Sequence, residues 1–343
     1  MTARRDPLPV SVVIPAYDAA ATIAATLDSL VAQTRPAAEV VVVDDGSRDG
    51  TAEVVAAHPI GARLLRQPNG GLARARNAGV RAATHPWIVL LDADDLCDPR
   101  RLEAQWAVFG ALPDTGLCAS DFSMFDRDGP VPGARAEQYY TALGRQPGGR
   151  ATLLPEVRRI DLAGDVDAGV TVRRGRVYPR IALGNMLHPP TLMFPRSLIE
   201  RAGPFPEHVG SMSDFVWIVA AAMVAPVAFI DEPLLAYRLS DTQMSAARYS
   251  LKRALDRLRA YMAIEAADPA LPRVLGAGWR AAIGETHLDI ADAAAGAQRG
   301  RSLRHLARSL ACRYVETRSF TTLAKNLLPA TLAAAWRRWR GRG

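Results

Sequence analysis

The chain has 343 residues, of which 49% are hydrophobic and 22% charged, with a formal net charge of +7. Three cysteines without regular spacing argue against a disulfide-stabilised secreted domain and for a reducing compartment. Met1–Pro9 has no apolar core, so we expect no signal peptide. The longest uncharged run, Phe215–Ile230, is broken by Pro226 and is shorter than the ~20 residues of a spanning helix, so it predicts a buried helix followed by a strand.

Three apolar segments near the N-terminus predict strands that are buried on both faces of a parallel sheet. In chain order they are Val10–Ile14, Glu39–Val43 and Trp87–Leu91. Between the first two, Thr22–Gln33 has apolar residues on one stripe at helical spacing, and Thr51–Ala57 predicts a second, shorter helix. Alternating strands and helices indicate an α/β domain with a mostly parallel sheet and right-handed crossovers.

Carboxylates follow each of these predicted strands. They are Asp18 after the first strand, Asp44 and Asp45 after the second, and Asp92, Asp94 and Asp95 after the third. Parallel strands end at the same edge of a sheet, where open α/β sheets bind ligands, so these side chains should converge. Clustered carboxylates repel one another unless a cation joins them, and Mg²⁺ is often bound by carboxylates together with substrate phosphates. The pattern favours a metal–diphosphate site over its alternative, an acidic loop in which Asp98 caps the next helix.

Four motifs in this order carry a resemblance to a known family. VSVVIPAYDAAATIAATLDSLVAQT, VVVVDDGSRDGT, QPNGGLARARNAGV and WIVLLDADD resemble the family-two glycosyltransferases of the GT-A fold. A later block, Asn185–Leu239, resembles the family too. The resemblance covers most of residues 9–245. It implies a Rossmann-like three-layer sandwich in residues 1–245, followed by a C-terminal helical region in residues 246–343.

The resemblance also implies roles for individual residues. Asp214 matches the family's general base, and Asp94 matches the ligand of a divalent Mn²⁺ or Mg²⁺ ion. Without that resemblance, Asp214 would be read as the N-terminal residue of an apolar helix, and Arg76 as a solvated helix arginine. The positions that match nucleotide-sugar-binding residues are Pro15, Ala16, Tyr17, Asp18, Asp44, Asp45, Asn69, Arg76, Asp92 and Ala93.

The sequence departs from the family pattern at several of these motifs. Asp18 stands where Asn is usual, Ala20 where Glu is usual, and Ser213 replaces the Glu of an acidic pair. The His often found after Tyr-Arg is absent, so Asp241 or water must substitute for it. There is no Q-x-x-R-W block, which the processive synthases of the family carry, so we expect one sugar to be added per encounter.

We therefore expect a hexosyl-type, inverting, metal-dependent glycosyltransferase of cell-surface polysaccharide or glycolipid synthesis. Its partners would be a nucleotide-diphosphate sugar donor and a glycan or lipid-linked acceptor. An alternative, motivated by Ser213 and the missing His, is a catalytically silent nucleotide-sugar-binding or scaffold protein. A dinucleotide-dependent oxidoreductase is disfavoured because no G-x-G-x-x-G follows the first strand.

The C-terminal segment is strongly basic. Residues 299–343 contain eleven Lys and Arg but one acid, Glu316, together with Trp336 and Trp339. Leucines lie at helical spacing in this segment, which is typical of a helix at an anionic lipid surface. We expect a cytoplasmic protein with peripheral contact to the inner face of the plasma membrane. The alternative is amphipathic helices packed on the catalytic domain, and we expect no nucleic-acid partner because no recognised motif accompanies the charge.

Residues 126–184 are rich in Gly, Pro and Arg and show no clear periodicity. The family carries acceptor-side loops at this position, so the resemblance implies a mobile insertion over the site. The alternative is a long surface connection. Just before it, Cys118 lies in an apolar predicted strand, where we expect a buried and inert thiol.

Overall fold

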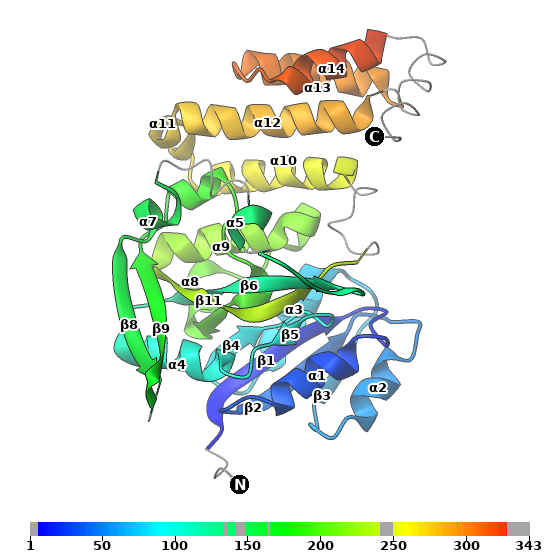
Figure 1. Cartoon of the computed structure of the whole chain (residues 1–343). Helices are drawn as coiled ribbons and strands as arrows, with labels where there is room; N and C mark the ends of the chain where they lie inside the picture. Colours follow the sequence, from blue (N-terminus) through cyan, green and yellow to red (C-terminus); the bar gives the residue numbers. More distant parts are fainter. Residues whose placement is uncertain are drawn as a thin grey trace. The chain divides into compact units, whose positions relative to one another are not determined.

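The fold is described from a computed structural model, which covers residues 6–133, 136–140, 148–162, 165–240, 250–295 and 297–327 (Figure 1). The chain divides into two compact units, Met1–Ser240 and Asp241–Gly343. The boundary predicted between residues 245 and 246 lies outside the described residues.

The first unit is built on a mixed sheet in the order β3-β2-β1-β4-β10-β6-β11-β9-β8, with β5 paired to β11 and β7 to β6. The half formed by β3, β2, β1 and β4 is parallel throughout. β10 is antiparallel to both of its neighbours, β4 and β6. β6 and β11 are parallel to each other, β9 is antiparallel to β11, and β8 is antiparallel to β9. The strands are β1 Leu8–Ala16, β2 Ala37–Asp44, β3 Arg63–Arg66, β4 Trp87–Leu90, β5 Leu96–Cys97, β6 Leu117–Asp126, β7 Gly129–Val131, β8 Glu156–Leu162, β9 Asp165–Gly175, β10 Met193–Pro195 and β11 Val227–Arg238.

Helices cover both faces of this sheet and give three layers. On one face, α1, α2 and α4 pack on Val12 and its neighbours; on the other lie α3, α8 and α9. The helices of this unit are α1 Ile23–Val31, α2 Thr51–Ala57, α3 Leu72–Ala82, α4 Arg101–Ala111, α5 Ala136–Tyr139, α7 Gly149–Leu153, α8 Ser197–Ala202 and α9 Ser213–Val224, with 3-10 turns η1 Arg180–Leu183, η2 Pro189–Thr191 and η3 Glu207–Met212. The predicted three-layer α/β fold is confirmed.

Strand β1 shows why the apolar runs predicted buried strands. Val12 packs into the core formed with α1, whereas the neighbouring Val13 faces α3. There, a Cβ atom added to Gly79 would lie 2.3 Å from Cγ1 of Val13, so α3 approaches the sheet as closely as glycine allows. Apolar residues are therefore needed on both faces of the strand, as in other parallel sheets.

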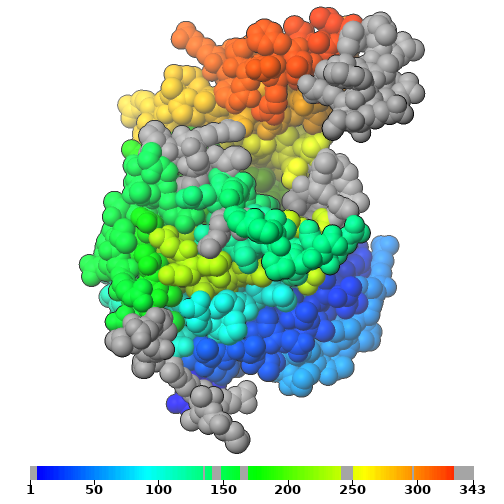
Figure 2. Space-filling model, viewed as in Figure 1, coloured from blue at the N-terminus to red at the C-terminus, as the bar shows by residue number. Residues whose placement is uncertain are grey.

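The described part of residues 126–184 contains strands that the sequence did not predict. The described part contains the β8–β9 hairpin, which joins the sheet through pairing of β9 with β11 and lies at its edge (green in Figure 2). Arg173 forms an ion pair with Asp231 at 2.7 Å across that pairing. No strand is predicted here from the sequence because an edge hairpin buries few side chains and keeps many polar ones in contact with water.

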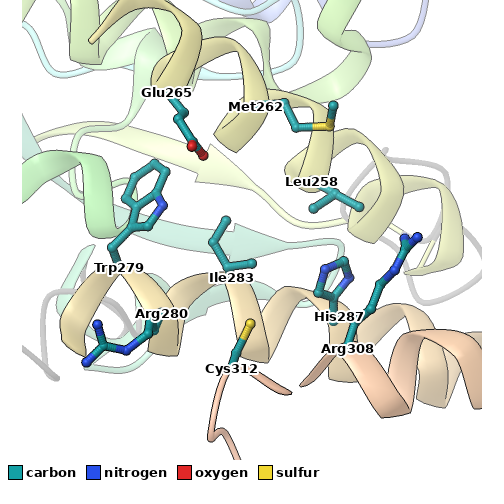
Figure 3. A pocket seen from close by; sticks show the side chains of 9 residues that line it. All are labelled: Leu258, Met262, Glu265, Trp279, Arg280, Ile283, His287, Arg308 and Cys312. Carbon is teal, nitrogen blue, oxygen red and sulfur yellow. The ribbon is translucent and has the colours of Figure 1, made fainter. Parts of the chain in front are cut away.

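The second unit is helical in its described residues, with α10 Ser250–Ala267, α11 Leu271–Leu275, α12 Ala277–Ala294, α13 Arg299–Ala311 and α14 Thr317–Leu327. α12 packs on α10 and on α13, and α14 contacts both α12 and α13. A pocket of about 350 Å³ lies within this unit and contains none of the predicted site residues (Figure 3). Its lining comes from α10, α12, α13 and Cys312: Leu258, Met262, Glu265, Trp279, Arg280, Ile283, His287, Arg308 and Cys312. No helix in the described part of the chain is both long and apolar enough to cross a bilayer.

Candidate active site

The carboxyl ends of β1 and β2 are joined directly. The backbone N–H of Asp45 donates to the carbonyl of Ala16 at 2.8 Å. Asp44, the last residue of β2, is fully buried; its carboxylate accepts hydrogen bonds from the Ser47 backbone N–H at 2.8 Å and from Arg66 Nε at 3.0 Å. Both oxygens of Asp44 therefore already have protein partners, which makes this side chain a support of the loop that follows β2.

Asp45 organises the loop that leads into α3. Its carboxylate accepts hydrogen bonds from the backbone N–H groups of Gly70 at 2.9 Å and Gly71 at 2.7 Å. The loop also lies close to Gly46, where an added Cβ would be 2.8 Å from the backbone nitrogen of Asn69, and where φ is +79°. Only glycine adopts that conformation freely and permits that approach. Asp45 thus positions Asn69, which is exposed.

The turn after β1 carries the other residues predicted at this edge. Pro15 and Ala16 end the strand, and Tyr17 is exposed. Asp18 has a positive φ of 48°, which Asp tolerates better than most residues, and its carboxylate accepts the backbone N–H of Arg48 at 2.8 Å. The substitution of Asp for the family's Asn therefore keeps a residue type suited to this backbone.

Arg76 of α3 links two of the predicted site residues. Its Nη2 donates to Oδ1 of Asp92 at 2.8 Å, and its Nη1 lies 3.9 Å from Oδ2 of Asp214. These three residues come from α3, the end of β4 and the start of α9, so the fold brings together positions far apart in the sequence. Arg76 is fully buried, which rules out the solvated arginine considered from the sequence.

The guanidinium of Arg76 keeps hydrogen-bonding capacity toward this site. Its Nε and Nη1 atoms have no hydrogen-bond partner among the residues that the structure describes. Buried donors are rarely left unsatisfied in folded proteins, so water or a ligand would complete these hydrogen bonds. A planar guanidinium suits phosphate oxygens, to which it can donate two parallel hydrogen bonds.

The turn that follows β4 is fixed from α1. The carbonyl of Ala93 accepts hydrogen bonds from the hydroxyl groups of Thr22 at 2.9 Å and Thr26 at 3.1 Å. These contacts set the backbone between Asp92 and Asp94. Both carboxylates therefore stand on a turn whose conformation is held from within the core.

Asp95 shows that the carboxylates after β4 repel one another. It is buried, its Oδ1 accepts the backbone N–H of Arg238 at 3.0 Å, and its Oδ2 has no partner among the described residues. Burial, followed by the charges of Asp94 and Asp92, raises the pKa of Asp95 well above its usual value. A cation near this turn would relieve that repulsion.

The donor set fits a divalent ion that also binds phosphates. No group of three or more His, Cys, Asp or Glu side chains with metal-site geometry occurs among the described residues. Mg²⁺ and similar ions are commonly held by one or two carboxylates, with phosphates completing the sphere. Asp94, aided by Asp92, would supply those carboxylates.

Asp214 lies in the first turn of α9, as the interpretation as a helix N-terminal residue expects, and its role as a base stays a prediction. Its Oδ1 accepts the backbone N–H of Phe215 at 2.7 Å, and its side chain is about one-fifth exposed. Burial raises the pKa of Asp214, while the positive charge of Arg76 opposes that rise. A carboxylate fixed at a helix N-terminus with a raised pKa is a suitable proton acceptor.

Two residues that the sequence did not single out lie beside this centre. His188 is buried against Phe122 with ring centroids 4.4 Å apart, and its Nδ1 is 2.8 Å from the hydroxyl oxygen of Tyr140. Burial, followed by the charges of Arg76 and Arg101, lowers the pKa of His188 to about 3. The imidazole is therefore neutral at physiological pH. Its place in the block that resembles the family was the only sequence signal.

Arg238 is the second such residue. Its Nε donates to the carbonyl of Asp94 at 2.9 Å, and its guanidinium lies over the ring of Phe125 at 4.5 Å. Arg238 thus braces the acidic turn from β11. The Asp241 considered as a substitute for the missing His lies outside the described residues.

Solved structures show the same fold. The mannosyltransferase PcManGT from Pyrobaculum calidifontis, solved with GDP-Man and Mn²⁺, matches with a TM-score of 0.53 and 24% identity over 97% of this chain and 84% of that one. TarS of S. aureus, solved with UDP-GlcNAc, matches with a TM-score of 0.53 and 17% identity over 96% of this chain and 92% of that one. These likenesses establish a GT-A glycosyltransferase fold, and they extend over the C-terminal helical region.

Sequence comparison confirms the resemblance to family-two glycosyltransferases. Residues 11–160 match the model of glycosyl transferase family 2. The succinoglycan biosynthesis protein ExoU of Rhizobium meliloti is 35% identical over 178 residues, which are 50% of this chain and 47% of that protein. ExoO of the same organism is 46% identical over 95 residues, 27% of each chain. The matches thus span half or less of these relatives.

Proposed function

We propose that the protein transfers a sugar from a nucleoside-diphosphate sugar to an acceptor hydroxyl, with inversion at the anomeric carbon and with a divalent metal ion. The observation that carries this proposal is the Asp92–Arg76–Asp214 arrangement. The guanidinium of Arg76, the candidate group for binding the diphosphate, lies within 2.8 Å of Asp92 on the acidic turn and 3.9 Å of Asp214, the candidate base. The succinoglycan proteins among its relatives favour polysaccharide synthesis as the setting.

Each step of the transfer has a residue suited to it. Asp214 would accept the proton of the acceptor hydroxyl as the oxygen attacks the anomeric carbon. The bond from that carbon to the diphosphate oxygen breaks, and Arg76 would donate to the departing diphosphate through its unsatisfied N–H groups. Attack opposite to the leaving group inverts the centre without a covalent enzyme intermediate. A divalent ion on Asp94 would supply further neutralisation of the leaving group.

Other residues would shape the nucleotide pocket. The turn Pro15–Asp18 and the loop that contains Asn69 flank the ends of β1 and β2, where the base and ribose would lie. Asp44 and Asp45 would act mainly by fixing these loops, since their oxygens already accept protein hydrogen bonds.

The proposal also includes a glycan or lipid-linked acceptor and a location at the inner face of the plasma membrane. A lipid-linked acceptor would bring the enzyme to the inner face of a membrane. The basic segment predicted to contact that membrane spans residues 299–343, of which residues 328–343 lie outside the described residues.

Purified full-length protein would be tested for release of nucleoside diphosphate from UDP- and GDP-sugars with Mn²⁺ and oligosaccharide or lipid-linked acceptors. We expect turnover with at least one donor and a product of inverted configuration by NMR. The scaffold alternative, motivated by Ser213, predicts donor-dependent thermal stabilisation without turnover. A product of retained configuration would overturn the inverting assignment.

A further inference from the structure

Helix α14 buries its polar side and exposes its apolar side. Ser319, Thr322 and Asn326 are 5%, 0% and 2% exposed. The neighbouring stripe of Phe320, Leu323 and Leu327 is 67%, 40% and 63% exposed. Residues spaced by three and four lie on one face of a helix, so these three apolar side chains form a continuous outward stripe. A helix that only packed on its own unit would show the opposite arrangement.

Specific hydrogen bonds fix this orientation. Asn326 Nδ2 donates to Ser302 Oγ of α13 at 2.8 Å, and Thr322 Oγ1 donates to a carboxylate oxygen of Asp292 at 2.8 Å. Arg318 forms an ion pair with Asp289 of α12 at 2.7 Å. Rotating α14 to bury its leucines would leave these polar groups unpaired, which is costly in the interior. The exposure of the stripe thus follows from the hydrogen bonds and the ion pair that join α14 to α12 and α13.

The charge of the neighbouring helix α13, which contacts α14, selects a partner. Four arginines of α13 and of the turn after it form no ion pair with any described residue: Arg299, Arg301, Arg304 and Arg313. The single acid of residues 299–327, Glu316, pairs with Arg318. A second copy of this surface would bring arginines against arginines, which repel. An anionic surface with an apolar interior would accept both the arginines and the stripe.

We propose that the outward stripe of α14, together with the arginines of α13, docks on an anionic lipid bilayer. Phe320, Leu323 and Leu327 would enter the boundary between headgroups and acyl chains, while the arginines bind lipid phosphates. The chain continues from Leu327 into a segment whose sequence has the same chemistry, with four arginines, two tryptophans and no acid. The proposal concerns a surface rather than glycosyl transfer, and it stands without that activity.

The test is co-sedimentation of the full-length protein with vesicles of phosphatidylcholine alone and of phosphatidylcholine mixed with phosphatidylglycerol. We expect binding to the mixed vesicles only, weakened by salt. A triple variant, Phe320→Gln, Leu323→Gln and Leu327→Gln, should bind at least ~10-fold more weakly. The matched control is Met262→Gln with Val274→Gln, which changes exposed apolar residues of α10 and α11. The control should bind as the unaltered chain does.

Three outcomes would overturn the proposal. Equal binding by the triple variant, with loss of binding only on deletion of residues 328–343, would assign the membrane contact to the tail. Failure of the unaltered protein to bind mixed vesicles at low salt would exclude a lipid surface. If light scattering then showed a dimer that the triple variant lacks, the stripe would be a contact between copies. Circular dichroism would verify that each variant is folded, and transfer to a soluble acceptor should be unchanged in all of them.

Discussion

Oδ2 of Asp214 lies 3.9 Å from Nη1 of Arg76, so the candidate base and the candidate diphosphate-binding cation contact each other before any substrate is bound. The same guanidinium donates to Asp92. Charges of opposite sign at this distance favour the ionised form of the carboxyl group. Donor binding, which would engage Arg76 with phosphate, would therefore also alter the basicity of Asp214.

Replacing Asp214 by Asn should abolish most turnover while preserving donor binding. The amide oxygen can still accept the backbone N–H of Phe215, but it cannot take a proton from the acceptor. Loss of a general base typically lowers the rate ~10²–10⁴-fold. Steady-state kinetics and isothermal titration with donor would measure the two effects separately. Asp28→Asn, a change of the same type at an exposed position of α1, serves as the control. If kcat survived while donor affinity collapsed, Asp214 would serve binding instead.

The acid limb of the pH–rate profile should report on the contact between Arg76 and Asp214. A base must be ionised, so the rate falls as the pH drops through its pKa. Burial raises the pKa of Asp214, so the fall should begin at a higher pH than for an ordinary aspartate.

Because the charge of Arg76 lowers that pKa, Arg76→Met should move the acid limb to still higher pH, and Arg76→Lys should move it less. The pH dependence of residual kcat/KM in both variants would check this. An acid limb that stays in place in Arg76→Met would show that another group titrates.

The part of the fold that can be predicted from the sequence is the part whose strands are marked by local apolar runs. The predicted strands Val10–Ile14 and Glu39–Val43 lie in β1 and β2, and Trp87–Leu91 overlaps β4, which ends at Leu90. Strands buried on both faces need such unbroken apolar runs. The order of strands and helices also predicted that their acidic ends meet on one edge. The joining of Ala16 to Asp45 confirms that expectation for β1 and β2.

The features that were not foreseen depend on contacts between distant segments. The three-residue strand β10 exists through pairing with β4 and β6. His188 comes near enough to Arg76 for that charge to lower its pKa only once the sheet is complete. The helical spacing predicts an apolar stripe that includes Leu323 and Leu327. It does not predict which side of α14 is buried, because Ser, Thr and Asn can also be buried when they are hydrogen-bonded.

Replacing Asp94 by Asn should weaken metal-dependent binding of nucleoside diphosphates and leave the fold intact. Its carbonyl, which accepts Arg238 Nε, is unaffected by the change. Loss of a metal contact should lower affinity in Mn²⁺ by roughly 10–100-fold or more. Titration calorimetry with and without Mn²⁺ would measure this, with Asp98→Asn as a control further along the chain. Full activity of the unaltered protein in excess EDTA would contradict the assignment of a metal to Asp94.

His188 should make the first unit less stable as the solution becomes acidic. Burial lowers the pKa of His188 from 6.5 to about 3, so the unfolded chain takes up its proton at a higher pH than the folded one. Stability is then fully present above about pH 6.5 and is lost as the pH falls toward about 3, by at most about 5 kcal/mol.

His188→Gln should remove this contribution while keeping a polar group within reach of Tyr140. The measurement is urea unfolding of the unaltered and variant proteins at several pH values across that window, with the exposed His208→Gln as control. His287, whose pKa is lowered to about 4 chiefly by burial, contributes to both proteins and cancels in their difference. The stability difference between the two proteins should shrink or reverse as the pH falls. A difference that is constant with pH would mean that His188 is not held neutral by its surroundings.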